Sequence, residues 1–179
     1  MTSSHRRRLV VAAGVFLLPG RLLAQTCGKQ TPPQTAGPFF KPSSPQRISL
    51  VENGKPRLIV TGIVMSAQCK PVPNALLDFW HADEDGDYDN HGFRYRGHQH
   101  ADGQGRYRLE TIVPAEYPGR TRHIHVKVQA PGRRVLTTQL YFPGETGNSR
   151  DGLYEKALEM RLAKKAEAAE GAFDFIVDA

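Results

Sequence analysis

The sequence lacks several features that would place it in a specialised class of protein. It has only two cysteines among 179 residues, too few for a disulfide-rich scaffold or a cysteine-based zinc site. It has no apolar run close to the ~20 residues that a membrane-spanning helix needs. Its hydrophobic share of 39% and charged share of 23% are ordinary, which excludes wholesale disorder and predicts one globular domain with a packed core.

The first residues have the pattern of an export signal. Three consecutive arginines at 6–8 precede an apolar run at 9–18, and Ala24 is a small residue where a signal peptidase could cut. The adjacent arginines are typical of a twin-arginine signal, although His5 stands where Ser or Thr is usual. We therefore predict that residues 1–24 direct export and that the protein acts in the periplasm or as a secreted protein.

Removing this segment changes what the net charge indicates. Residues 1–24 hold four arginines and no acidic residue, so the basic count falls from 24 to 20 against 18 acidic residues. A balance this even does not indicate nucleic-acid binding. In an oxidising compartment Cys27 and Cys69 could pair as a disulfide, and two unlinked thiols are the alternative.

The rest of the chain reads as an extended amino-terminal arm followed by an all-β domain. Residues 25–56 are rich in Pro, Gly, Ser, Thr and Gln, which disfavours regular structure, and residues 57–179 form the predicted domain. Short β-type segments separated by turn residues indicate an antiparallel β-sandwich core or a barrel. The predicted strands are Arg57–Met65, Ala75–Ala82, Gly105–Ile112, His123–Gln129 and Val135–Phe142, with Phe173–Val177 as a last strand.

One segment near the carboxyl end has helical composition. Leu153–Glu170 is rich in Ala, Glu, Lys, Leu and Met and is followed by Gly171, which predicts one C-terminal helix. We attach no function to its charged residues, because they are most simply a solvated face.

Four of the seven histidines form two His-x-His pairs, His98/His100 and His123/His125. Successive side chains of a strand alternate between its faces, so His123 and His125 point the same way and could bind one metal ion. Two structural histidines beside basic neighbours are the alternative interpretation. For His98 and His100 we expect a solvent-exposed loop at 92–100, and a substrate-side feature is the alternative.

Two tyrosines lie in turn-rich surroundings that could present their hydroxyls. Tyr117 precedes Pro118 and Gly119 in a turn before the second histidine pair; a corner tyrosine bonded only to backbone is the alternative. Tyr88 follows an acidic loop with aspartates at alternate positions. These aspartates invite a calcium interpretation, but the glycine position and the twelfth residue, Arg94, do not match an EF-hand.

Four motifs in order resemble those of the intradiol ring-cleaving dioxygenases. They are QTAGPFF, ALLDFWHADEDGDYDN, DGQGRYRLETIVPAEYPGRTRHIHVKV and TTQLYF, and the resemblance runs from about residue 32 to 143. It is nearer to the protocatechuate 3,4-dioxygenase branch than to the catechol 1,2-dioxygenases, whose amino-terminal helical region has no counterpart among these motifs. The ordered combination is far more specific than any single motif.

The resemblance implies a site and a reaction. It implies that a non-haem Fe(III) ion is held by Tyr88, Tyr117, His123 and His125. It also implies that Arg120 is the active-site arginine, that Tyr117 acts as general base, and that the remaining catalytic residue is Gln139. The implied reaction opens a catechol with O2 to a cis,cis-muconate-type dicarboxylate, in a protein that associates as a homo-oligomer.

Two other functions fit parts of the same pattern. A cupin-like Fe(II) or Mn(II) oxygenase would use one His-x-His pair and a carboxylate on a barrel. An exported β-sandwich binding module would keep the fold without catalysis.

Overall fold

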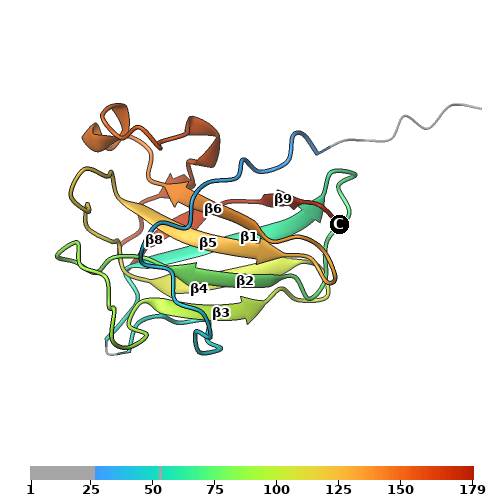
Figure 1. Cartoon of the computed structure of the whole chain (residues 1–179), viewed down its shortest axis with the longest axis horizontal. Coiled ribbons are helices and arrows are strands. Elements are labelled where there is room, and N and C mark those ends of the chain that lie inside the picture. Colours follow the sequence, from blue (N-terminus) through green and yellow to red (C-terminus); the bar gives the residue numbers. More distant parts are fainter. Residues whose placement is uncertain (1–26, 53) are drawn as a thin grey trace, which may run out of the picture.

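The structure is a computed structural model that describes residues 27–52 and 54–179, and it consists of two β-sheets packed face to face (Figure 1). The predicted export segment, residues 1–24, lies outside the described residues. The expected all-β sandwich is confirmed. Among the described residues, no helix has the length and apolar character needed to cross a membrane.

The first sheet is antiparallel and has the strand order β3-β2-β5-β6. Its strands alternate between core and outer face, so that Phe79 and Ile124 are fully buried between the sheets. In its register Trp80 pairs with His125, and His125 pairs with Gln139, so these three side chains lie in one row on the outer face. The strands are β2 (Leu76–Trp80), β3 (Arg96–His100), β5 (His123–Gln129) and β6 (Leu136–Tyr141).

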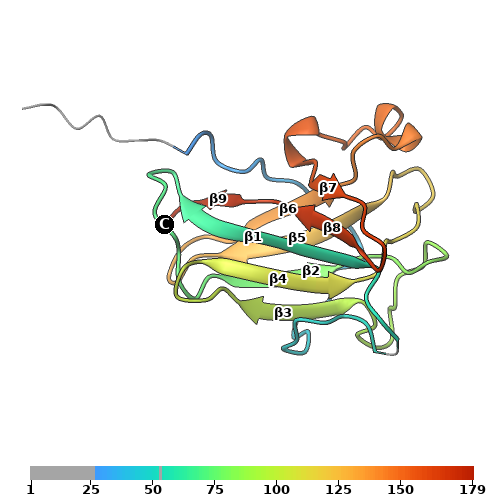
Figure 2. The same ribbon diagram turned by 180° about the vertical axis from the view of Figure 1, so that it is seen from behind.

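The second sheet is mixed, as Figure 2 shows from behind. Its central strand β1 (Leu58–Ser66) pairs antiparallel with β4 (Arg106–Thr111) and parallel with both β8 (Ala169–Ala172) and β9 (Phe175–Val177). The short β7 (Arg161–Ala163) extends this sheet beyond β8. The prediction of antiparallel sheets therefore holds for the first sheet and only in part for the second.

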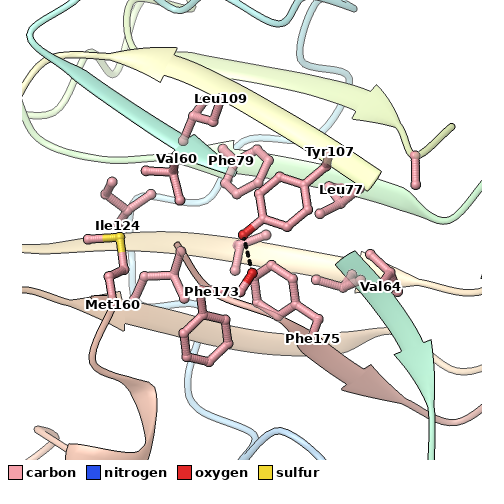
Figure 3. Close-up of a cluster of buried hydrophobic side chains, with 14 of the residues drawn as sticks. Val60, Val64, Leu77, Phe79, Tyr107, Leu109, Ile124, Met160, Phe173 and Phe175 are labelled. Atoms are coloured by element: carbon pink, nitrogen blue, oxygen red, sulfur yellow. Dashed lines mark hydrogen bonds between the residues drawn. The ribbon is translucent and has the colours of Figure 1, made fainter. Parts of the chain in front are cut away.

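Apolar side chains from both sheets fill the space between them (Figure 3). Val60 of β1, Leu77 of β2 and Phe175 of β9 are fully buried, and each such side chain contributes ~1.5–3 kcal/mol of hydrophobic stabilisation. The buried hydroxyl of Tyr107 donates a hydrogen bond to the Phe173 carbonyl at 2.9 Å. This bond satisfies two polar groups that burial would otherwise leave unpaired.

The amino-terminal arm crosses the outer face of the first sheet, as the blue segment of Figure 1 shows. Within residues 27–52 it forms only isolated bridges, Gln46 with His98 and Ser49 with Glu110, which cover the free edges of β3 and β4. A disulfide between Cys27 and Cys69 ties its start to the body of the domain, so the alternative of two unlinked thiols is wrong.

The predicted C-terminal helix over Leu153–Glu170 is wrong. The segment instead holds a 3-10 turn η2 (Lys156–Leu158) and the strands β7 and β8; a second 3-10 turn, η1 (Thr146–Ser149), precedes it. The physical reason is tertiary packing: Leu158 and Met160 are buried at alternate positions, which is a strand period, and the Met160 amide donates to the Tyr141 carbonyl. Helix propensity is a weak term that such contacts override.

The predicted loop at 92–100 is also wrong in its second half, because residues 96–100 form β3. His98 lies opposite Asp78 of β2, and its Nδ1 is 2.7 Å from the Ser44 carbonyl. The non-local pairing with β2 and with the arm decides the structure of this polar segment. His98 therefore helps to hold the arm on the sheet.

Gly62 is a residue of β1 and faces Phe173, which lies between β8 and β9. A Cβ atom at Gly62 would come within 1.7 Å of the Phe173 carbonyl oxygen, the same oxygen that accepts the Tyr107 hydroxyl. A side chain here would push the backbone of Phe173 away from β1.

We expect Gly62→Ala to lower the free energy of unfolding by ~3 kcal/mol or more, because the clash is with backbone and breaks the Tyr107 bond. Gly103→Ala is the matched control, since nothing lies within 4 Å of its Cβ position. Denaturant unfolding of both variants checks this. Equal stability of the two variants would contradict the close approach at Gly62.

Candidate functional site

The candidate site lies on the outer face of the first sheet, beneath the arm. The alternation predicted for β5 is confirmed: His123 and His125 share the outer face, and Ile124 between them is in the core. Both histidines are almost fully buried, at 4% and 3% exposure. The Trp80 ring stacks on His125 with centroids 4.9 Å apart and an interplanar angle of 2°, which fixes the orientation of this imidazole.

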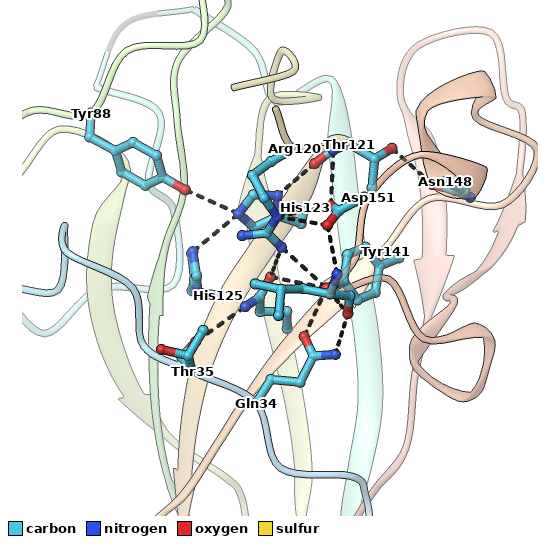
Figure 4. Close-up of polar contacts among 12 residues, drawn as sticks. Gln34, Thr35, Tyr88, Arg120, Thr121, His123, His125, Tyr141, Asn148 and Asp151 are labelled. Carbon is cyan, nitrogen blue, oxygen red and sulfur yellow. Dashed lines mark hydrogen bonds and ion pairs between the residues drawn. The ribbon is translucent and has the colours of Figure 1, made fainter. Parts of the chain in front are cut away.

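Three potential ligand atoms converge at this point (Figure 4). His123 Nε2 lies 3.1 Å from His125 Nε2 and 3.3 Å from the Tyr88 hydroxyl. Tyr88 reaches the histidines from the loop that follows β2, 35 residues earlier in the chain than His123. The structure therefore brings together residues that sequence spacing alone does not connect.

The protonation of His123 can be assigned from its partners. Its Nδ1–H donates to the Thr121 carbonyl at 2.6 Å, an atom that can only accept. Burial, aided by Arg120, lowers the pKa of His123 to about 4, and burial also lowers the pKa of His125 well below 6.5. His123 is therefore a neutral imidazole at pH 7, and its Nε2 lone pair faces the other two atoms.

These atoms fit a metal cation. Burial raises the pKa of the Tyr88 hydroxyl above 10, so this side chain is a neutral phenol unless a positive charge is bound beside it. Nδ1 of His125 is buried and has no hydrogen-bond partner among the described residues. A cation would take the Nε2 lone pairs and depress the phenol pKa, and a phenolate with imidazoles suits ferric iron among common metals.

Tyr117 lies beside Tyr88, with ring centroids 6.0 Å apart. Its turn is closed by a hydrogen bond from the Arg120 amide to the Tyr117 carbonyl at 2.8 Å. Among the described residues the Tyr117 hydroxyl has no hydrogen-bond partner, so it is not the backbone-bonded corner tyrosine. Phe39 of the arm stacks on Tyr88 at 4.4 Å and meets Tyr117 edge-on at 5.3 Å.

Arg120 and Gln139 contact each other at the edge of the same site. Arg120 Nη2 donates to Gln139 Oε1 at 2.6 Å, and Gln139 Nε2 donates to the Thr35 carbonyl of the arm at 3.2 Å. On its other side Arg120 Nε contacts both carboxylate oxygens of Asp151 at 2.9 and 3.0 Å. The guanidinium is thus held from two directions.

An open hollow of about 470 Å³ adjoins Tyr117 and Arg120. Asp85, Glu116 and Arg150 also line it, so both signs of charge are present. A hollow of this size accommodates a small organic molecule.

Asp151 is the most important site residue that the sequence interpretation missed. Its side chain is 1% exposed, and besides Arg120 it accepts the backbone amides of Thr121 and Leu153. It lies in a loop with no periodic pattern, so only the three-dimensional structure identifies it. Tyr141 was also missed; its hydroxyl lies 3.3 Å from Arg120 Nη2 and 2.8 Å from Gln34 Oε1.

The acidic loop before Tyr88 uses its carboxylates to order its own backbone. Asp83 accepts the amides of Asp85 and Asp87 and pairs with Arg94. Asp89 likewise accepts the amides of His91, Gly92 and Arg94, so two of the four aspartates order the backbone of this loop.

The sequence is similar to known proteins over most of its length. Residues 36–179 match a family model described as Dioxygenase. The chain is 30% identical over 184 residues to a catechol 1,2-dioxygenase of Acinetobacter baylyi, covering 80% of this chain and 59% of the relative. It is 36% identical over 127 residues to a protocatechuate 3,4-dioxygenase beta chain of Burkholderia cepacia, covering 59% and 54%. The chain thus spans little more than half the length of these curated relatives.

Solved structures show the same similarity. The dioxygenase domain of a dioxygenase–carbohydrate-binding protein fusion from Streptomyces sp. SirexAA-E is 55% identical, with a TM-score of 0.81, covering 84% of this chain and 99% of that one. An intradiol ring-cleavage dioxygenase from Tetranychus urticae, 24% identical with a TM-score of 0.76 and covering 83% and 94%, shares the fold.

We expect Asp151→Ala to lower the free energy of unfolding by ~3–5 kcal/mol, because it leaves a partly buried guanidinium and two amides without their acceptor. Asp151→Asn, which keeps one acceptor oxygen, should cost less. Lys165→Ala is the control, because its ion pair with Glu170 is more than half exposed on both sides and should contribute less than ~1 kcal/mol. Thermal and denaturant unfolding measure all three, and an Asp151→Ala variant as stable as the control would contradict this role.

Proposed function

Because this chain belongs to the intradiol ring-cleavage dioxygenase family, we propose that it uses O2 to open the ring of a catechol-type diol at a non-haem ferric centre. The bond broken lies between the two hydroxylated carbons. Both oxygen atoms enter the product, a cis,cis-muconate-type dicarboxylate. The observation that carries the proposal is the convergence of Tyr88, His123 and His125 beside Tyr117.

In this proposal Tyr88, Tyr117, His123 and His125 hold the iron. Ferric iron supplies Lewis acidity, which favours the deprotonated diol and makes its ring reactive toward O2. Burial keeps His123 neutral, and because its Nδ1–H donates to the Thr121 carbonyl, the lone pair on Nε2 is left for the metal. Stacking of Trp80 on His125 prevents this second imidazole from turning away.

Tyr117 is the proposed general base. Tyr117 lines the hollow, and its hydroxyl is free of hydrogen bonds to described residues, so a diol entering there could pass a proton to the Tyr117 oxygen once it is deprotonated. Phe39 covers Tyr88 and the edge of Tyr117, and the arm thereby limits the access of water to both phenol rings.

Arg120 is the proposed electrostatic catalyst. It lines the hollow with Tyr117, and its contacts with Asp151 and Gln139 fix the guanidinium before substrate arrives. A preorganised positive charge stabilises electron density that develops on the ring, and such a donor is typically worth ~3–4 kcal/mol. Gln139 acts by positioning Arg120.

The family match does not support the cupin-like alternative. In addition, within residues 27–52 and 54–179 no three His, Cys, Asp or Glu side chains are arranged to hold a metal ion.

We propose that the protein works after export, in the periplasm or outside the cell. The arginines and apolar run of residues 1–24 support this, as does the Cys27–Cys69 disulfide, since disulfides persist in oxidising compartments. A homo-oligomer is part of the same proposal. Its basis is the association usual in the family.

The direct test is oxygen uptake by Fe(III)-loaded protein with catechol, protocatechuate and hydroxyquinol as separate substrates. We expect a red-brown protein, coloured by phenolate-to-iron charge transfer, that consumes one O2 per diol. Tyr88→Phe should lose iron and shift the visible band. Tyr95→Phe is the matched control, because that hydroxyl contacts only the exposed Glu84.

Two results would contradict the proposal. A coloured, iron-loaded protein that consumes no oxygen with any diol would favour the non-catalytic binding module. A protein that purifies with zinc alone and gains neither colour nor activity with ferric iron would contradict the proposed ferric centre.

A further inference from the structure

Arg96 of β3 is a buried arginine that the proposed reaction does not use. It is 1% exposed, and among the described residues no carboxylate lies within ion-pair distance of its guanidinium. Nε donates to the Asp89 carbonyl at 3.0 Å and Nη1 to the Phe39 carbonyl at 2.6 Å. Nη2 is buried and has no hydrogen-bond partner in the described part of the chain.

Burying the Arg96 guanidinium in this way lowers the stability of the fold unless a negative charge lies nearby. Removing a guanidinium from water costs several kcal/mol, and two carbonyl groups compensate only in part. The neighbouring carboxylates are engaged elsewhere: Asp89 accepts the amides of Gly92 and Arg94, and Asp78 accepts the Ser44 hydroxyl. The uncompensated charge therefore points to an anion that forms close by.

The sheet register brings Arg96 to the metal site. Arg96 pairs with Trp80, and Trp80 pairs with His125, so Arg96 belongs to the same outer-face row as the proposed ligand. Its guanidinium carbon lies 5.9 Å from the centroid of the Tyr88 ring.

The two carbonyls that Arg96 binds flank Tyr88. One belongs to Asp89, the next residue in the loop, and the other to Phe39, whose ring stacks on Tyr88 at 4.4 Å. Arg96 thus holds both the loop that carries Tyr88 and the arm residue that covers it.

We propose that Arg96 is a positioning residue for Tyr88 and supplies the positive charge that balances its phenolate when iron is bound. The inference rests on the proposed function. Arg120 also lowers the pKa of the Tyr88 hydroxyl, but Arg96 differs in binding both segments that flank this ligand.

The test compares Arg96→Lys with Arg96→Gln in Fe(III)-loaded protein. Both replacements can donate to a carbonyl, but only Lys keeps the charge. We expect Arg96→Gln to move the charge-transfer band to longer wavelength, because a less stabilised phenolate gives up an electron more readily. We also expect EDTA to remove its iron on the order of 10-fold faster, because losing a group that supports a metal ligand typically costs ~10- to 100-fold in metal affinity and such losses mostly raise the dissociation rate. Arg96→Lys should stay close to the wild type in both.

Arg47→Met is the structural control. Arg47 ties the arm to the same region through the carbonyls of Arg96 and Phe93. Its loss should lower stability but leave the band and the rate of iron loss unchanged. If Arg96→Gln does not fold, Arg96→Met serves as the neutral variant, because apolar replacement of a buried charge is often tolerated.

A wild-type band and rate of iron loss in the neutral variant would overturn the inference, as would equal shifts in the Lys and Gln variants. These results leave the proposed function standing. A wild-type protein that shows no charge-transfer band would overturn the proposed function and this inference together.

Discussion

Side chains of β5 alternate between the core and the outer face of the first sheet, and the candidate site depends on this alternation. Burying Ile124 between the sheets forces His123 and His125 to the same side. Hydrophobic packing, rather than any attraction between the imidazoles, therefore brings their Nε2 atoms to 3.1 Å. A cation bound at this point would be within reach of both Nε2 atoms.

The remaining parts of the site are delivered by segments without regular structure. Tyr88 and Tyr117 come from loops, and Phe39 comes from the arm. Rigid contacts at the base of each segment compensate for this: Asp83 closes the loop before Tyr88, Asp151 fixes the residues after the Tyr117 turn, and Arg96 joins the loop to the arm. Oxygen donors on irregular segments thus acquire defined positions on a rigid sheet.

Local pattern accounts for what could be predicted from the sequence. The strands that became β1, β2, β4, β5 and β6 were found within one or two residues, because their apolar alternation is local. The same alternation gave the shared face of His123 and His125. Proximity of Tyr88 and Tyr117 came from the family resemblance, since no rule of spacing relates loops so far apart.

Non-local contacts account for what was missed. β3 is polar, and only its pairing with β2 makes it a strand. Leu153–Glu170 has helical composition, but burial of Leu158 and Met160 against the sandwich decides its structure. The roles of Asp151 and Arg96 depend on contacts that form only after folding. The residues next to them in the sequence do not predict those roles.

The central claim is that two phenols and two imidazoles of this chain hold one ferric ion. Anomalous diffraction at the iron edge from crystals of the Fe(III)-loaded protein tests it most directly. We expect one strong peak within coordination distance of Tyr88, Tyr117, His123 and His125. A peak elsewhere, or one bound by the imidazoles while both phenol oxygens lie out of reach, would contradict it.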